Sequence, residues 1–153
     1  MSSFTTQLLL TPVDGETETF YLREHFRYRI GERDSKQIIE VPNGFITDGA
    51  SIPGIVQNIL SPWGQYGKAA VLHDFLYKTN LLGLQKASDQ LLLEAMEVLG
   101  VSKWQRVAIY RALRIGGWVA WNNYRKNDAN RIAREQLVGF SNLNLSRERK
   151  VGK

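Results

Sequence analysis

The apolar residues of this chain change their period once, from alternating to helical, and the change falls within residues 44–54. Before that break, Phe26, Tyr28 and Ile30 alternate with arginines, a pattern typical of a half-buried strand. Other short apolar runs in this part are bounded by turn residues. They predict three or four short antiparallel strands, at residues 4–10, 20–22, 26–30 and 38–41.

After the break, apolar residues recur at helical spacing. A first helix is predicted at residues 68–78, and a second at 89–99 begins at Ser88 or its neighbours and is closed by Gly100. Ser102 is expected to cap a third helix. Within that helix, Gly116-Gly117 either interrupts the helix or lets another helix approach closely. A last helix is expected at residues 128–138.

The length of the chain fits one folded domain. With 153 residues, of which 43% are hydrophobic, it can bury a sizeable core. We predict an α+β fold, with a small N-terminal antiparallel β-sheet followed by a helical bundle. In a single domain of residues 1–140, residues 1–46 are expected to be β-rich and residues 52–138 helical. Residues 141–153 are expected to form a basic tail.

Missing residue types and patterns exclude several classes of protein. The chain has no cysteine, which excludes a disulfide framework, a thiolate metal site and a cysteine nucleophile. No apolar run approaches the length of a membrane-spanning helix. The N-terminus also lacks the basic region and apolar run of a signal peptide. We therefore expect a protein made in the cytoplasm, with no transmembrane segment.

Positive charge is concentrated in the last third. Residues 103–153 carry 12 basic and 3 acidic side chains, a net charge of +9, whereas residues 1–60 carry 5 and 8, a net charge of −3. Such a block favours an anionic partner: phospholipid, an acidic protein surface or, less favoured, nucleic acid. The alternative is that these charges form the solvated face of long helices.

Aromatic residues are interleaved with the arginines of this block. Trp104, Trp118, Trp121 and Tyr124 fall at helical spacing. We expect them to pack in the core rather than to form a base-stacking platform. An interface is the other alternative, because Trp and Arg are common interface anchors.

The segment His73-Asp74-Phe75-Leu76-Tyr77 carries the strongest chemical pattern. On a helix, His73 and Tyr77 lie on one face, and Asp74 points about a quarter turn away. A proton acceptor, a candidate cation ligand and a phenol thus lie within one turn. The alternative is a helix with an apolar face and one satisfied, partly buried histidine, which is the commoner situation for a lone histidine.

The break itself, residues 44–54, contains Asp48, Ser51 and a proline able to open a helix. One interpretation is a connection in which Ser51 caps a helix. The other is a loop that presents backbone groups and Asp48 to a ligand. A nucleophilic triad of Ser51, His73 and Asp89 is conceivable, but no nucleophile-elbow sequence surrounds Ser51.

The pattern of His73, Asp74 and Tyr77 resembles the active-site helix of secreted phospholipases A₂, including the disulfide-free version in parvovirus capsid proteins. The resemblance implies that His73 is the general base and that Asp74 binds calcium. It also implies that an Asp on the next helix, Asp89, orients the histidine and is hydrogen-bonded by Tyr77. That family has a glycine-rich calcium loop upstream. Here Asp48-Gly49-Ala50-Ser51 lies at a plausible distance with a different sequence.

Three segments, residues 47–53, 73–77 and 88–96, together resemble an uncharacterised family encoded by tailed bacteriophages and prophages. The resemblance implies a phage origin, and therefore synthesis in the host cytoplasm. A role in the virion is a further expectation. We expect a hydrolase-like protein with a His-Asp site, acting on lipid esters with calcium as its cofactor. Its alternative is a non-enzymatic virion component, such as a tail or baseplate piece. The candidate site residues are His73, Tyr77 and Asp89 as catalytic groups, Asp74 and Asp48 as metal ligands, and Ser51.

Overall fold

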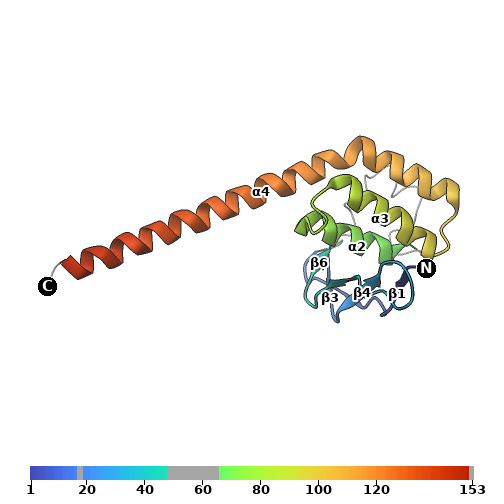
Figure 1. The fold of residues 1–153 in the computed structure, drawn as a ribbon, viewed down its shortest axis with the longest axis horizontal. Helices are drawn as coiled ribbons and strands as arrows, with labels where there is room; N and C mark the ends of the chain where they lie inside the picture. The colour runs from blue at the N-terminus through green and yellow to red at the C-terminus, as the bar shows by residue number, and fades with distance from the viewer. Residues whose placement is uncertain (17–18, 48–65, 152–153) are drawn as a thin grey trace.

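The computed structural model describes residues 1–16, 19–47 and 66–151, with side chains described as far as residue 128. Figure 1 shows short strands on one side of the molecule, two helices beside them, and a long helix beyond those two. The fold is α+β, as predicted. Its strands are β1 (Ser3–Phe4), β2 (Leu10–Pro12), β3 (Phe20–Leu22), β4 (Phe26–Arg29), β5 (Ile38–Val41) and β6 (Ile46–Thr47), and its helices are α2 (Gly67–Thr79), α3 (Gln85–Val98) and α4 (Lys103–Val151).

The described strands form two three-stranded antiparallel sheets, where the sequence predicted one. β4 lies between β1 and β5, and β3 lies between β2 and β6. The predicted alternation is present in β4, where Phe26 and Tyr28 are buried and Arg27 is exposed. The single strand expected at residues 4–10 is wrong. Its first part pairs with β4 and its end pairs with β3, so this segment passes from one sheet to the other.

The boundaries of α2 and α3 are set by their caps. α2 ends where Asn80 takes a left-handed φ of 56° and donates its N–H to the carbonyl of Leu76 at 3.0 Å. α3 begins at Gln85, one turn earlier than predicted. Ser88 does not cap this helix, because its hydroxyl donates back to the carbonyl of Leu84 at 3.4 Å within the first turn.

The predicted stop at Gly100 is present. Gly100 has a φ of 75° and donates its N–H to the carbonyl of Glu97 at 2.9 Å. The N–H of Val101 reaches the carbonyl of Met96 at 3.0 Å. Together these bonds form the Schellman pattern, in which a left-handed glycine satisfies the last carbonyls of a helix.

α4 is one continuous helix from Lys103 to Val151. The separate helix expected at residues 128–138 and residues 141–151 of the expected tail are both part of it. Gly116-Gly117 does not interrupt the helix, so close approach is the alternative that holds. A Cβ atom at Gly117 would lie 2.9 Å from the Tyr77 hydroxyl and 3.2 Å from Gln85 Nε2. The absent side chain therefore lets α4 lie against α2.

The core lies between the strands and the helices. Tyr28 of β4 is fully buried, and its hydroxyl donates to Glu94 of α3 at 3.0 Å, which ties one sheet to the helices. Four polar side chains of α2 and α3 are buried among the apolar ones. They are His73, Asp74, Ser88 and Asp89, and they mark where this core departs from an ordinary apolar one.

The contact at Gly117 gives a prediction for stability. Gly117→Ala adds a methyl group against the hydroxyl of buried Tyr77, and such overpacking costs about 1–3 kcal/mol. The gain in helix propensity from glycine to alanine is about 1 kcal/mol and offsets part of that cost. We expect a net loss in urea unfolding. In a Tyr77→Phe background, which lacks the hydroxyl, Gly117→Ala should be neutral or stabilising, and an equal loss in both backgrounds would contradict the contact.

Candidate active site

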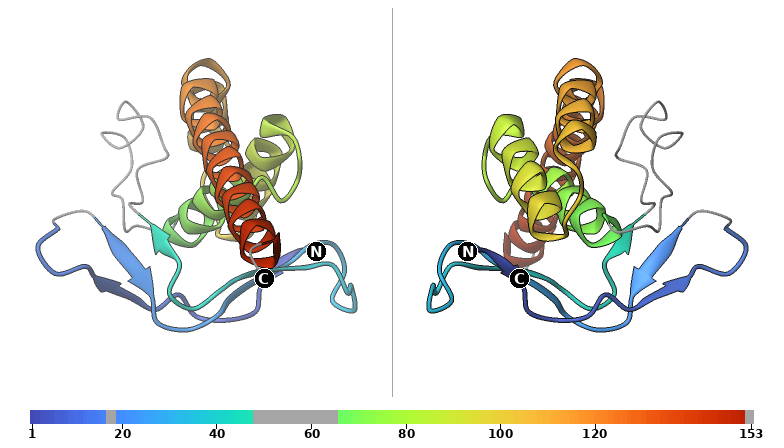
Figure 2. Two further views of the ribbon diagram at one scale, coloured as in Figure 1. Left: turned by 90° about the vertical axis from the view of Figure 1, so that its left-hand side faces the viewer. Right: turned by 90° about the vertical axis from the view of Figure 1, so that its right-hand side faces the viewer.

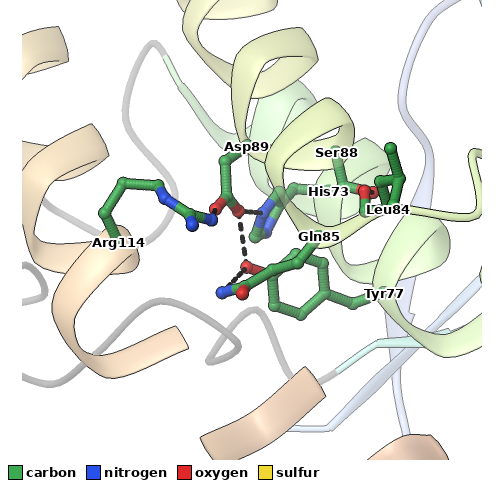
Figure 3. A network of polar contacts seen from close by, with 7 residues as sticks. All are labelled: His73, Tyr77, Leu84, Gln85, Ser88, Asp89 and Arg114. Carbon is green, nitrogen blue, oxygen red and sulfur yellow. Dashed lines mark hydrogen bonds and ion pairs between the residues drawn. The ribbon is translucent and has the colours of Figure 1, made fainter. Parts of the chain in front are cut away.

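The centre of the candidate site is the buried carboxylate of Asp89, near the start of α3 (Figure 3). Its Oδ1 accepts hydrogen bonds from His73 Nε2 at 3.0 Å and from the Tyr77 hydroxyl at 2.5 Å. Its Oδ2 accepts one from Arg114 of α4 at 2.9 Å. The contact predicted between His73 and a carboxylate is therefore present, and three helices meet at one acidic group.

Asp89 fixes both the orientation and the tautomer of His73. An ionised carboxylate has no proton to donate, so Nε2 of the neutral imidazole carries the proton and Nδ1 is the accepting nitrogen. Nδ1 is buried, and no group in the described parts of the chain hydrogen-bonds to it. The ring centroid lies 4.1 Å from that of Tyr77. In the neutral ring, the lone pair of Nδ1 is thus not used by any described group, and this is the arrangement required of a general base.

The electrostatics of the site favour a charged Asp89. Burial opposes ionisation of this carboxyl group, but hydrogen bonds from His73, Tyr77 and Arg114 outweigh it and hold the pKa of Asp89 below its usual value. Burial, and then the hydrogen bond to Asp89, raises the pKa of the Tyr77 hydroxyl far above its usual value. Tyr77 therefore stays a neutral donor, and Asp89 stays an acceptor at neutral pH.

Two residues of this network, Gln85 and Arg114, were not among those predicted from the sequence. Gln85 Nε2 donates to the Tyr77 hydroxyl at 3.3 Å, from the first turn of α3. Arg114 lies three residues before Gly117, on the part of α4 that approaches α2, and this spacing is the signal that could have identified it. Gln85 was missed because α3 was predicted to begin later.

The other end of α2 is also held by α4. Arg125 donates to the carbonyl oxygens of Tyr77 and Lys78 at 2.6 and 3.1 Å. Its guanidinium lies over the ring of Trp121, 4.9 Å from the centroid, and Trp121 packs edge-on against Tyr77. Tyr77 is therefore fixed at both its hydroxyl and its backbone by residues of α4 and α3.

Asp74 belongs to a neighbouring group of contacts. Its Oδ2 lies 2.9 Å from Lys78 Nζ, which also donates to the carbonyl of Ile46 at 3.1 Å. Among the described residues, no three His, Asp or Glu side chains form a group that could hold a metal ion. The other predicted ligand, Asp48, and the candidate Ser51 lie outside the described residues.

The expectation that the aromatic residues of α4 are core is correct only in part. Trp121 and Tyr124 are half-buried, and Trp121 packs on Tyr77. Trp104 and Trp118 are mostly exposed, so the core expectation is wrong for them. They lie on the side of α4 opposite to buried Leu113, which the helical spacing of aromatics alone did not reveal.

Comparison with known proteins identifies the family of this chain and leaves its activity open. Residues 20–113 match the model of a family described as "Protein of unknown function (DUF1353)", and the chain belongs to that family. The matched segment includes His73, Tyr77 and Asp89 and ends one residue before Arg114. No curated protein and no solved structure matches the chain. In the part of the chain that the structure describes, no helix is long and apolar enough to cross a membrane, in line with the sequence.

The lowered pKa of Asp89 gives a prediction for acid stability. Because the folded-state value lies below the unfolded one, near 4, ionised Asp89 contributes stability above about pH 4. This contribution is lost as pH falls further, through the folded-state pKa. We expect Asp89→Asn to be less stable at pH 7 and to lose less stability on acidification, measured by urea unfolding. Exposed Asp34→Asn is the control, and an acid decline in Asp89→Asn as steep as in the natural chain would contradict this role.

Proposed function

We propose that this protein is a hydrolase in which His73 acts as the general base. The observation that carries the proposal is the state of the imidazole. Its Nε2 is bound by Asp89 at 3.0 Å, and its Nδ1 is left without a partner among the described residues. A histidine kept only for packing needs neither a buried carboxylate nor a free lone pair, and both cost stability when buried.

The proposed chemistry uses the network as it stands. Nδ1 of His73 accepts a proton from a water molecule as that water attacks an ester carbonyl. The imidazolium that forms is stabilised by the negative charge of Asp89, which stays ionised. Tyr77 and Arg114 hold Asp89 in place and do not exchange protons with the reactants. The site thus divides into one base, one orienting anion and two groups that position the anion.

Burial sets a condition on this reaction. The side chains of His73 and Asp89 are fully buried. The reactive form must therefore admit both water and the ester to Nδ1. The same burial strengthens the attraction between the imidazolium and Asp89, because fewer water molecules screen it.

The more specific part of the proposal is that the substrate is a lipid ester and that calcium is the cofactor. It rests on the resemblance of the histidine helix to phospholipases A₂. Asp74 and Asp48 would supply oxygen ligands, which calcium prefers. Because Asp74 is paired with Lys78, a cation at this carboxylate would have to displace the ammonium group. The described residues alone do not make up a calcium site.

Fatty-acid release from phospholipid vesicles, with calcium or with a chelator, tests the proposal. His73→Ala should lower the rate about 10²–10⁴-fold, the usual contribution of a general base. His25→Ala is the matched control, because His25 is an exposed histidine paired with Glu40 at 3.0 Å. A melting curve for each variant shows whether the fold is kept. Full activity in folded His73→Ala would contradict the catalytic role of His73. Equal rates with calcium and with chelator would contradict only the requirement for calcium.

A non-enzymatic phage virion component, for example in a tail or baseplate, is the second candidate. Two observations favour it. His73 and Asp89 are fully buried, and Figure 1 shows α4 projecting far beyond the rest of the molecule, as an assembly element would. If the protein is such a component, the hydrogen bonds around His73 serve to stabilise the fold. No release of fatty acid by the natural chain under any metal condition, together with a lowered melting temperature of His73→Ala, would favour this candidate.

Neither of these functions explains the positive charge of residues 103–153. We propose that this block contacts an anionic partner, either phospholipid or an acidic phage protein. A net charge of +9 makes such contact dependent on salt, because exposed charges are screened within about 8–10 Å at physiological ionic strength. Reversing the charges of Arg147, Arg149 and Lys150 together should weaken binding to anionic vesicles at low salt. Binding that is absent, or unchanged between low and high salt, would leave the block as a solubilising surface.

A further inference from the structure

The first part of α4 carries a continuous exposed strip on the side that faces away from the rest of the protein. We name it the α4 outer face, and its members are Trp104, Arg111, Ile115, Trp118, Val119 and Lys126. Trp104, Arg111 and Trp118 are spaced by seven residues, two helical turns, so they share one side of the helix. The opposite side contains buried Ile109 and Leu113, which pack on the body of the protein.

Four members of this face are exposed apolar side chains. Trp104 is 65% exposed, Ile115 77%, Trp118 55% and Val119 48%. Large exposed apolar side chains gathered in one strip mark a binding surface more often than scattered ones do. Figures 1 and 2 show the first part of α4 at the edge of the molecule, with the strands and the other two helices to one side. The exposed fractions of its side chains show that the strip is open to solvent.

Six cations of α4 lie among the residues whose side chains the structure describes, and they are Lys103, Arg106, Arg111, Arg114, Arg125 and Lys126. Three of them are neutralised by the fold: Arg106 by Glu97, Arg114 by Asp89 and Arg125 by Asp128. The described structure shows no ion-pair partner for Lys103, Arg111 or Lys126. Lys103 and Arg111 line a shallow hollow together with Trp104, and Lys126 lies further along the outer face. Two of the three described cations without an ion-pair partner, Arg111 and Lys126, therefore belong to the α4 outer face.

We infer that the α4 outer face docks on an anionic lipid bilayer, with the helix lying along the surface. Tryptophan prefers the boundary between headgroups and acyl chains, and Ile115 and Val119 can enter the apolar layer beside it. Lys and Arg extend their charged ends to lipid phosphates while their stems stay apolar. The bilayer thus satisfies both the apolar and the cationic members of the face.

Other occupants fit less well. In a pair of identical chains joined through this face, Arg111 of both copies would be buried between the tryptophans without a countercharge. Nucleic-acid interfaces are more polar than this strip, and aliphatic Ile115 and Val119 offer no stacking surface to bases. Apart from the shallow hollow beside Trp104, the strip is one side of a single helix, and a broad deformable surface suits that shape.

Vesicle co-sedimentation of the full chain tests this inference independently of catalysis. The probes are vesicles of phosphatidylglycerol mixed with phosphatidylcholine, and vesicles of phosphatidylcholine alone. We expect binding only to the first. Trp104→Ser together with Trp118→Ser should weaken it about tenfold or more, and Arg111→Glu should act similarly. Leu81→Ser together with Leu84→Ser is the control, since these residues are 55% and 66% exposed but lie off α4. His73→Ala should bind normally, which separates docking from hydrolysis.

Three outcomes would overturn the inference. Unchanged vesicle binding in the double tryptophan variant would assign the attraction to charge alone. Absence of binding to either kind of vesicle would exclude the bilayer as the occupant. A lipid-free dimer in analytical ultracentrifugation that the double tryptophan variant abolishes would make the face a contact between copies of this chain. Because these side chains are exposed, their replacement should leave the melting curve unchanged, and this is checked for each variant.

Discussion

The ionised carboxylate of Asp89 is the group on which the helical part of this protein depends. A lone buried charge would be strongly unfavourable, and this one is stabilised because α2 supplies two donors and α4 a third. Asp89 itself is on α3. The relative positions of the three helices are therefore specified by a polar contact as well as by the apolar core around it. A substitution at Asp89 therefore bears on the packing of all three helices.

The parts of the structure that local patterns encode were predictable from the sequence. The alternation in β4, the stop at Gly100 and the turn carrying His73 and Tyr77 each depend on neighbours a few residues apart. The contact of His73 with Asp89 was expected from the resemblance of the histidine helix to that of phospholipases A₂, in which an Asp of the next helix orients the histidine. The structure contains this contact.

The features that the sequence did not predict depend on contacts between residues that are far apart in the chain. The segment at residues 4–10 joins two different sheets, and which strand it meets is decided by partners far along the chain. Arg114 was distinguished from the other arginines of α4 only by its spacing from Gly117, and the meaning of that spacing depends on how α4 packs on α2. The exposure of Trp104 and Trp118 was likewise not predicted. Helical spacing identifies a shared face but not whether that face is turned inward or outward.

Because α4 is one helix from Lys103 to Val151, the candidate site and the outer surface share a single element. Its axis changes direction in the orange part of Figure 1, so its two parts do not form one straight rod. At 1.5 Å per residue, its 49 residues follow a path of roughly 70 Å. Arg114 and Arg125, which hold Asp89 and the end of α2, lie on the same helix that projects from the molecule. A partner bound to the projecting part would therefore grip the helix whose side chains position the residues around His73.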